Sequence, residues 1–301
     1  MYVYMYKYKF TLINTFGAAL LFRTLVFPQH FHLLQNITEE GSIVAIGVCD
    51  SEKPVALVLA EIWPHINFAR IHSIFVLPTY RCHGIGTVLL ARLEKELLSR
   101  GCNKIKIRCK TGKPITIALE RLLQKCNWSL PKPIRIVCKS DWDTIANAPW
   151  LYIKYRIPRD MVIFPWAEIT TQERALLQQT QKAKPWIEEG LNPFQHEENF
   201  EPLNSLGLRY QGQVVGWLLT ERIAPDTISY DCMYVQEDFQ RMGRGIALVV
   251  HAIQLQAQAQ ISRGIWYVDV ENVPMICFVK KRMASYLTSI EEVCESFKLL
   301  N

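Results

Sequence analysis

An apolar strand, a glycine-containing turn and a helix follow one another in residues 71–101, IHSIFVLPTYRCHGIGTVLLARLEKELLSRG. The strand-like run ends at Val76, and the run RCHGIG (residues 81–86) begins five residues later. Leucines then recur at helical spacing, and Gly101 stands where such a helix would end. The segment therefore predicts a strand that enters a long helix through a tight turn.

Residues 230–264, YDCMYVQEDFQRMGRGIALVVHAIQLQAQAQISRG, repeat this layout. Here the strand ends at Val235, the turn reads QRMGRG over residues 240–245, and apolar residues again recur at helical spacing after it. A strand-like segment follows each helix, at residues 104–109 and 265–270. Two copies of one layout argue against a chance match.

A turn between a strand end and a helix start directs unpaired backbone N–H groups toward one point. The helix dipole adds positive potential there, and glycine permits unusual backbone angles and the close approach of a ligand. Both turns therefore predict a phosphate or diphosphate site. Two familiar forms of such a site are excluded, because neither turn has the G-x-G-x-x-G order of a dinucleotide site or the G-K-[ST] ending of a Walker loop.

Length and composition indicate a soluble globular protein with two domains. The chain has 301 residues, of which 50% are apolar and 21% are charged, and about 150 residues form a typical domain. Prolines and tryptophans gather around residues 131–166, where prolines disfavour helix interiors and central strands. We therefore expect an N-terminal domain at 1–148 and a C-terminal domain at 149–301.

Cysteine spacing and the amino terminus bear on the compartment. The nine cysteines are scattered and form no C-x-x-C pair, which argues against a disulfide framework or a zinc ribbon and predicts a reducing compartment. An apolar run at residues 10–22 is interrupted by Asn14 and closed by Arg23, so we do not interpret it as a signal peptide. No segment reaches the roughly 20 apolar residues of a transmembrane helix. We expect a cytoplasmic protein with no metal and no membrane partner.

Positive charge gathers in the first half of the chain. Residues 1–150 carry 19 Lys and Arg against 10 Asp and Glu, while residues 151–301 carry 15 against 18. Basic residues alternate with apolar ones over 104–110, a pattern typical of a strand with one solvated face. The same strip could meet nucleic acid or a phosphate-bearing cofactor, so nucleic acid stays open as a less favoured partner.

The order R/Q-x-x-G-x-G/A between a strand and a long helix resembles the acyl-CoA-binding motif of the GNAT acyltransferase superfamily. It is present in residues 81–86 and again in residues 240–245. Downstream of the second copy, Asn272 opens a segment that resembles the family's second motif, and the first copy lacks this asparagine. The resemblance implies an α/β fold of the α+β type, with two GNAT-like domains, each a mixed, mostly antiparallel sheet flanked by helices.

The resemblance also implies an activity and a cofactor. The chain would transfer an acyl group, acetyl from acetyl-CoA above all, to a small-molecule or peptide amine that attacks the thioester directly. The pantetheine arm would lie where the fourth and fifth strands of the family fold splay apart, and backbone groups of the turn would hold the diphosphate. The cofactor-binding residues carried over by position are Val76, Arg81, Cys82, His83, Gly84, Ile85 and Gly86 in the first copy, Val235, Gln240, Arg241, Met242, Gly243, Arg244 and Gly245 in the second, and Asn272.

Two residues align as the catalytic base that takes the proton of the amine. His72 and Asp231 each lie four residues before the valine that ends their strand. The pKa of a histidine near neutrality suits the task, although His72 also fits an edge or core position. An unpaired carboxylate in an apolar strand is costly, so Asp231 is either a base or the partner in a structural pair. Glu61, on the preceding strand, is a weaker third candidate.

The chain departs from the family in one respect. Many members carry a tyrosine acid in the helix of the second motif, where this chain has Leu123 and Val279. A non-catalytic acyl-CoA-binding or scaffold protein is therefore the alternative function. The carboxy-terminal copy keeps Asn272 and Asp231 and is the favoured active copy. An acidic and aromatic segment at 184–204 would suit a cationic amine, unless it is an ordinary surface loop.

Overall fold

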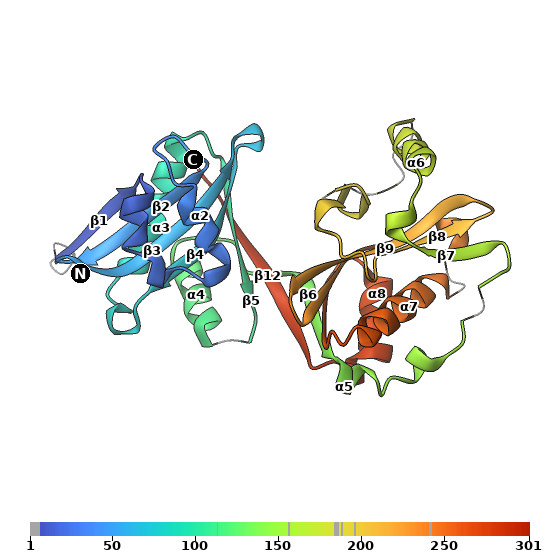
Figure 1. The fold of residues 1–301 in the computed structure, drawn as a ribbon. Helices are drawn as coiled ribbons and strands as arrows, with labels where there is room; N and C mark the ends of the chain where they lie inside the picture. Colours follow the sequence, from blue (N-terminus) through green and yellow to red (C-terminus); the bar gives the residue numbers. More distant parts are fainter. Residues whose placement is uncertain are drawn as a thin grey trace. The chain divides into compact units, whose positions relative to one another are not determined.

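The computed structural model describes residues 7–112, 114–155, 157–183, 187, 189–195, 197–240 and 243–301. The chain divides into two compact units (Figure 1). Unit 1 contains residues 1–134 and 292–301, and unit 2 contains residues 135–291.

Unit 1 is built on a mixed sheet. Its strands, in the order in which they pair, are β1 (Tyr8–Ile13), β2 (Ile43–Asp50), β3 (Lys53–Trp63), β4 (Phe68–Val76), β5 (Lys104–Lys110) and β12 (Ser289–Leu299). Neighbouring strands are antiparallel except β4 and β5, which are parallel. The helices of this unit are α1 (Phe16–Leu20), α2 (Phe31–Gln35), α3 (Ile85–Ser99) and α4 (Pro114–Lys125).

The alternation of side chains along β3 gives unit 1 a helix layer on each face of its sheet. Val58 and Ala60 belong to the apolar cluster that contains the buried leucines of α3. Leu57 and Leu59 belong to the cluster that contains buried residues of α1 and α2. Because both faces are covered, β3 is apolar almost throughout instead of alternating with polar residues.

Unit 2 repeats this plan. Its strands, in pairing order, are β6 (Lys132–Asp141), β11 (Arg263–Asp269), β10 (Thr227–Val235), β9 (Gln213–Ala224), β8 (Leu206–Tyr210) and β7 (Met161–Pro165). Only β10 and β11 are parallel among these neighbours. The helices are α5 (Trp142–Ile145), α6 (Thr171–Ala183), α7 (Arg244–Gln258) and α8 (Val273–Phe278). The expected fold class, a mixed and mostly antiparallel sheet flanked by helices, is confirmed in both units.

The boundary between the units differs from the expected ranges 1–148 and 149–301. Residues 135–141 of β6 pair with β11 inside unit 2, and residues 293–299 of β12 pair with β5 inside unit 1 (Figure 1). Pairing joins residues as distant as Arg108 and Glu295, which are 187 positions apart. Because such pairing is non-local, no run of residues near position 148 marks the boundary.

A reciprocal cap holds the start of α6. The Glu173 N–H donates to Thr170 Oγ1 at 3.2 Å, and the Thr170 N–H donates to the Glu173 carboxylate at 2.8 Å. Thr170→Ala should lower the free energy of unfolding of unit 2 by about 1 kcal/mol, because it leaves a helix N–H unpaired. Urea unfolding measures the change, and Thr171→Ala, one residue inside the helix, is the matched control. An equal loss in both variants would contradict the assignment of the cap to Thr170.

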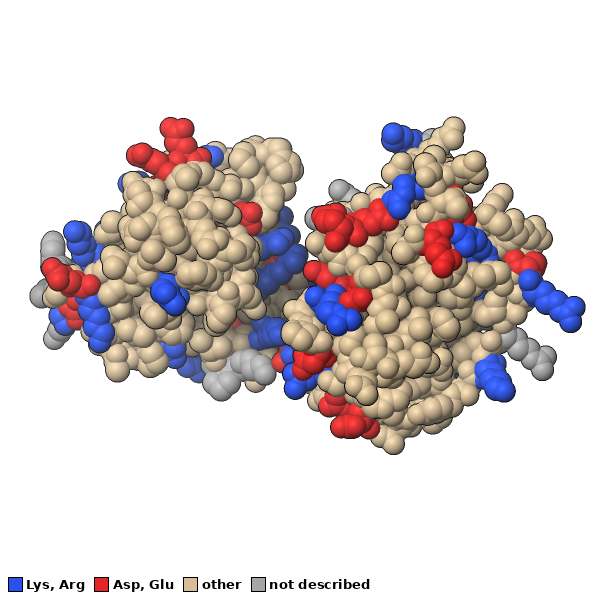
Figure 2. Space-filling model, in the orientation of Figure 1, with Lys and Arg blue, Asp and Glu red and all other residues tan. Residues whose placement is uncertain are grey.

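Charge is unevenly divided between the units. Unit 1 carries 18 Lys and Arg against 10 Asp and Glu, and unit 2 carries 16 against 18. On the face shown in Figure 2, acidic and basic side chains lie beside each other over unit 2. The positive potential of the protein therefore belongs to unit 1.

Three further observations concern cofactors and compartments. Within the described residues, no helix is long and apolar enough to cross a membrane. In the same part of the chain, no group of three or more His, Cys, Asp or Glu side chains is arranged to bind a metal ion. All nine cysteines are free thiols.

Candidate functional site

In each unit the two parallel strands separate before the turn that the sequence singles out. The pairing of β4 with β5 runs from Phe68 to Ile71, and that of β10 with β11 runs from Thr227 to Tyr230. Each of the two longer strands then continues for five more residues, to Val76 and to Val235. The last part of each strand therefore has a main-chain edge beside the point of separation.

A β-bulge lies where the strands separate. In unit 1, Leu59 pairs with Ser73 while the next residue of β3 pairs with Ile71, so His72 is the extra residue. In unit 2, the same shift between Tyr230 and Cys232 leaves Asp231 as the extra residue. A bulge re-aims the side chain that it carries. Both candidate bases thus occupy the same structural position, and the pairing register that produces it is not visible in the sequence.

The valine at the end of each strand presents its main chain to the separated edge. The Leu77 N–H donates to Val55 O at 2.9 Å on the β3 side, so the N–H and C=O of Val76 point to the other side. The Gln236 N–H makes the equivalent bond to Val215 O at 2.8 Å, which turns the Val235 groups in the same way. Both valines therefore have their main-chain N–H and C=O at the separated edge.

The first residue of each turn ties the turn to its strand. Arg81 Nε donates to Val76 O at 3.0 Å, and Gln240 Nε2 donates to Val235 O at 2.8 Å. An arginine and a glutamine thus make the same bond, which explains why either residue type serves at this position. Because this bond uses the carbonyl of each valine, the valine N–H is the main-chain group that a ligand can bind.

A glycine with positive φ starts each helix. Gly84 has φ 81° and Gly243 has φ 75°, and as the N-cap residue neither glycine has a side chain to cap the helix that follows. The N–H groups of the first helical turn are therefore available to an anion. A Cβ on Gly84 would meet nothing within 4 Å, whereas one on Gly243 would lie 3.4 Å from Tyr155 Cδ1. The turn of unit 1 is the more open of the two.

The second glycine of each motif allows close packing. A Cβ on Gly245 would lie 2.6 Å from Met233 Cε, and one on Gly86 would lie 3.1 Å from Leu122 Cδ2. A larger residue at either position would require the end of the Met233 or Leu122 side chain to shift. The two glycines therefore allow each helix start to pack closely against its neighbours.

Other predicted cofactor residues differ in what their side chains can do. Ile85 is 1% exposed, and Arg244 at the same position of the second copy is also buried, with Nε on Met161 Sδ. Only the main chain of these two residues can contact a ligand. Asn272 caps α8, because its Oδ1 accepts from the Met275 N–H at 3.1 Å. The side chains of Cys82 and His83 are exposed on the turn, and Arg241 and Met242 lie outside the described residues.

His72 is held in a partly buried polar cluster. Its Nε2 lies 2.9 Å from Glu61 Oε2, and its ring centroid lies 5.1 Å from that of His30. Burial lowers the pKa of His72, and the contact with Glu61 opposes that shift only in part. The imidazole is therefore neutral at pH 7 and can accept a proton.

Asp231 has a simpler environment. Ser229 Oγ donates a short hydrogen bond to Asp231 Oδ1. The residue is exposed by surface area, yet the protein packed around its carboxyl desolvates the charged form and raises its pKa above the ordinary value. A raised pKa makes the carboxylate a stronger base than a free aspartate.

Acidic side chains of residues 184–204 form ion pairs with arginines of the same unit. In the acidic segment, Glu197 forms an ion pair with Arg174, and Glu201 forms one with Arg222. Because intramolecular cations already pair with these two carboxylates, the structure favours an ordinary surface loop over an acidic lip for a cationic amine. Trp186 and Glu188 of the segment lie outside the described residues.

The basic strip of β5 faces an acid in the same way. Lys106 Nζ and Arg108 Nε lie 2.5 Å and 2.9 Å from the carboxylate of Glu295 on β12. Lys104 Nζ lies 4.9 Å from the centroid of the Phe297 ring. The strip is thus a strand face with cross-strand partners, as its alternation indicates.

The positions expected for a tyrosine acid are part of the core. Leu123 is 1% exposed and Val279 is fully buried. Tyr286 is half-buried in the cluster around α8, and Tyr267 is exposed. Both positions are therefore occupied by apolar core side chains that cannot act as an acid.

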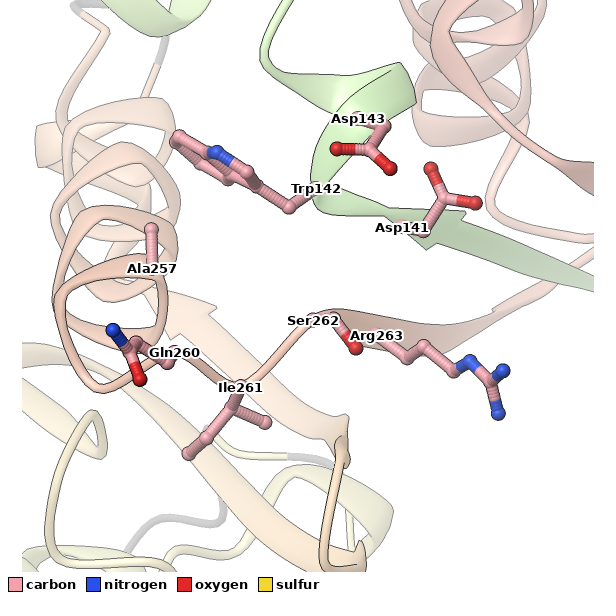
Figure 3. Close-up of a pocket in the computed structure, with 8 residues that line it drawn as sticks. All are labelled: Asp141, Trp142, Asp143, Ala257, Gln260, Ile261, Ser262 and Arg263. Carbon is pink, nitrogen blue, oxygen red and sulfur yellow. The ribbon is translucent and has the colours of Figure 1, made fainter.

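A separate pocket of about 500 Å³ lies at the other end of α7 (Figure 3). Its lining residues are Asp141, Trp142, Asp143, Ala257, Gln260, Ile261, Ser262 and Arg263. Since α7 starts at Arg244 and a helix rises 1.5 Å per residue, the pocket lies about 20 Å from the turn. It is not part of the candidate site.

Comparison with known proteins identifies the family. The family model for acetyltransferases (GNAT) matches residues 18–128 and 170–283. Among solved structures, a tandem GNAT protein from the clavulanic acid biosynthesis pathway has a TM-score of 0.66 at 12% identity and covers 98% of this chain and 99% of its own. A GCN5-related N-acetyltransferase from Sphaerobacter thermophilus has a TM-score of 0.62 at 16% identity, covering 97% and 96%.

These identities are low, so the likeness to solved structures shows the fold alone. No curated protein matches the chain. The family model nevertheless covers most of the sequence in two regions, and each region contains one separating strand pair with its glycine turn. The chain belongs to the acetyltransferase (GNAT) family and carries the family's fold twice.

Proposed function

We propose that the chain is an acyl-CoA-dependent N-acyltransferase that moves an acyl group, acetyl above all, from acetyl-CoA to a small-molecule or peptide amine. Family membership supports acyl transfer in general. The observation that carries the proposal is the pairing of a separated strand edge with an uncapped helix start, present in both units. A slender thioester arm fits the first feature and a diphosphate fits the second.

The residues present fit an acyl-CoA. The Val76 N–H faces the separated edge, and the open space over Gly84 admits the diphosphate. When bound, acyl-CoA supplies a thioester carbonyl that an amine can attack, and an oriented backbone N–H stabilises the charge that develops on the carbonyl oxygen. His72 takes the proton that the amine loses as the new C–N bond forms and the C–S bond breaks. The thiolate leaves with the electron pair of that bond, so the reaction needs no second enzyme acid near the pKa of the thiol.

Unit 1 is the better site of transfer. Its turn is more open, its net charge is positive, and its base has an oriented partner in Glu61. Acyl-CoA is strongly anionic, so a positive unit attracts it. The sequence alone favours the carboxy-terminal copy, whereas these contacts favour the amino-terminal one. Unit 2 keeps the same backbone plan, and Asp231 occupies the place of His72 at its bulge.

Release of free CoA thiol tests the proposal. The full chain is incubated with acetyl-CoA and a panel of small amines and amine-terminated peptides, and thiol is measured against a control without amine. Amine-dependent release supports the proposal. Binding of acetyl-CoA without release on any amine of the panel supports the alternative, a non-catalytic acyl-CoA-binding protein, and absence of binding contradicts both.

A charge placed in the turn shows which copy binds the cofactor. Gly84→Asp should weaken acetyl-CoA binding about tenfold, because the new carboxylate faces the diphosphate. Gly84→Asn is the matched control: asparagine and aspartate have the same shape and both tolerate positive φ. Gly243→Asp and Gly243→Asn make the same comparison in unit 2. Titration calorimetry measures the dissociation constants, and an equal loss in the Asp and Asn variants of one position would contradict a diphosphate site there.

The bond from Arg81 to Val76 makes a smaller prediction. Arg81→Ala should weaken acetyl-CoA binding about fivefold, because one hydrogen bond that shapes the turn contributes about 1 kcal/mol. Arg81→Gln imports the residue of the second copy, which makes the same bond, and should stay within about twofold of the wild type. If Arg81→Gln weakens acetyl-CoA binding as much as Arg81→Ala does, the guanidinium contacts the phosphates directly instead of shaping the turn.

Nucleic acid is a less favoured partner, because Glu295 already pairs with Lys106 and Arg108 on the basic strip. RNA binding at low salt that weakens steeply as the salt concentration rises would support nucleic acid as a partner. The free thiols fit a reducing compartment, and we place the protein in the cytoplasm on that ground.

A further inference from the structure

The contact between His72 and Glu61 assigns a proton to one nitrogen of the imidazole. Glu61 Oε2 lies 2.9 Å from His72 Nε2, and the two side chains are 26% and 16% exposed. A carboxylate accepts hydrogen bonds and cannot donate them. The neutral imidazole must therefore carry its proton on Nε2, which leaves the lone pair on Nδ1.

We propose that Glu61 is a positioning residue that locks His72 in this tautomer, so that Nδ1 takes the proton of the attacking amine in unit 1. The proposal rests on the proposed function. The amine nitrogen bonds to the thioester carbon and gives its proton to Nδ1. Nε2 keeps its proton and its bond to Glu61, whose negative charge stabilises the imidazolium. The proton on Nδ1 then passes to the departing thiolate or to water, which restores the starting tautomer.

The groups around His72 favour a neutral ring that is ready to accept a proton. Burial is the largest influence and lowers the pKa of His72, while Arg70 on the same strand and His32 on α2 lower it further. Glu61 raises it through both its hydrogen bond and its charge. The His30 ring lies tilted to that of His72 with its centroid 5.1 Å away, and its own pKa is lowered by burial, so it adds no positive charge at pH 7. Among the residues that the structure describes, Glu61 is the one whose hydrogen bond to a ring nitrogen of His72 is seen.

Unit 2 supplies an internal comparison. Glu61 pairs with Arg70 in the register of β3 and β4, just beyond the bulge, and Glu221 pairs with Ser229 at the same place in β9 and β10. The residue at the bulge is a histidine in unit 1 and Asp231 in unit 2, whose carboxylate bonds to Ser229. Both units thus place a glutamate at this position, and only unit 1 offers it an imidazole to orient.

Glu61→Gln tests the positioning role. The amide can donate as well as accept, so it no longer fixes the proton on Nε2. We expect kcat to fall about tenfold or more, by comparison with other histidines that lose an orienting carboxylate, with an unchanged dissociation constant for acetyl-CoA. The acidic limb of the pH profile should also move to lower pH, because the charge that raised the pKa of His72 is gone.

Nitrogen NMR of histidine-labelled protein reads the tautomer without any reaction. The chain has seven histidines, and the signals that vanish in His72→Gln identify His72. We expect the proton on Nε2 in the wild type and a mixture of tautomers in Glu61→Gln. A wild-type proton on Nδ1, or an unchanged tautomer in Glu61→Gln, overturns the proposal even if acyl transfer is confirmed. If no amine is acylated, the proposed function fails while this readout still shows whether Glu61 orients the ring.

Two controls separate positioning from a general loss of structure. Glu221→Gln changes the matching glutamate of unit 2 and should leave kcat within about twofold of the wild type. In a His72→Gln background, Glu61→Gln should cause no further loss, because there is no ring left to orient. A further loss of tenfold in that background would mean that Glu61 acts by another route and would overturn the proposal. Thermal unfolding of each variant confirms that the fold is intact.

Discussion

His72→Gln is expected to lower kcat for acyl transfer by about a hundredfold or more while the dissociation constant for acetyl-CoA stays unchanged. A general base contributes roughly 10²–10⁴ to the rate, and a glutamine amide cannot take up a proton near neutral pH. His72 contacts Glu61 and His30, away from the turn that precedes α3, so cofactor binding should persist. Steady-state kinetics and titration calorimetry measure the two quantities separately.

The pH profile gives the same variant a second signature. The pKa of His72 lies below its ordinary value of about 6.5 because burial disfavours the charged ring. The wild-type kcat should therefore rise as pH increases through that lowered pKa and be close to its plateau at pH 7. His72→Gln should lose this rise.

Asp231→Asn is the matched control, because Asp231 occupies the equivalent bulge in unit 2. It should leave kcat within about twofold of the wild type if transfer takes place in unit 1. A hundredfold loss in Asp231→Asn with normal activity in His72→Gln would move the reaction to unit 2 and contradict the assignment of the base to His72.

Deletion of residues 292–301 should unfold unit 1 and leave unit 2 folded. These residues form most of β12, whose residues 293–299 pair with β5. Leu300 is buried in the core of unit 1, and Lys298 Nζ bonds to Glu94 at 2.7 Å. A domain is stable by only about 5–15 kcal/mol, so the loss of a whole strand and its buried side chains exceeds what unit 1 can tolerate. Hydrogen exchange should show loss of protection in β2 to β5 and retained protection in β8 to β11.

Two controls accompany the deletion. Leu299→Ala removes an exposed side chain from the same strand and should leave the exchange of unit 1 unchanged, because the side chain is 60% exposed. A synthetic peptide of residues 292–301, added in excess to the shortened chain, should restore protection in β5. Full protection of unit 1 in the shortened chain without the peptide would contradict the role given to β12.

The turns and helices of the candidate site can be predicted from the sequence because their signals are local. The run from Val76 to Gly86 and its counterpart from Val235 to Gly245 carry glycine, a strand before it and helical spacing after it. The structure has a strand end, a positive-φ glycine and a helix at both places. These features depend on residues a few positions apart.

Features that depend on strand register could not be predicted in the same way. His72 and Asp231 stand out as polar residues in apolar strands, but the bulge that holds each of them arises from how one strand pairs with the next. Glu61 is visible as a candidate, yet its bond to His72 joins residues eleven positions apart on two strands. By sequence the two are alternative candidates for the base, whereas in the structure they are hydrogen-bond partners.

The ion pairs of the acidic segment and the boundary between the units also depend on contacts between distant residues, which the sequence does not show. Glu197 and Glu201 look like free carboxylates until their partners Arg174 and Arg222 are brought in by α6 and β9. Residues 135–141 belong to unit 2 because β6 pairs with β11, and residues 292–301 belong to unit 1 because β12 pairs with β5. No local sequence pattern reveals these ion pairs or the return of the chain to unit 1.

The late return of β12 has a consequence for synthesis on the ribosome. Unit 2 is continuous and is complete once residue 291 has emerged, whereas unit 1, although it is made first, waits for residues 292–301. At about 5–20 residues per second, the residues between 134 and 292 take roughly 10–30 s to make. During that interval β5 is an open edge of a half-finished sheet, the kind of surface through which nascent chains aggregate. Its four outward cations, at Lys104, Lys106, Arg108 and Lys110, repel other strands until the acidic Glu295 arrives with β12.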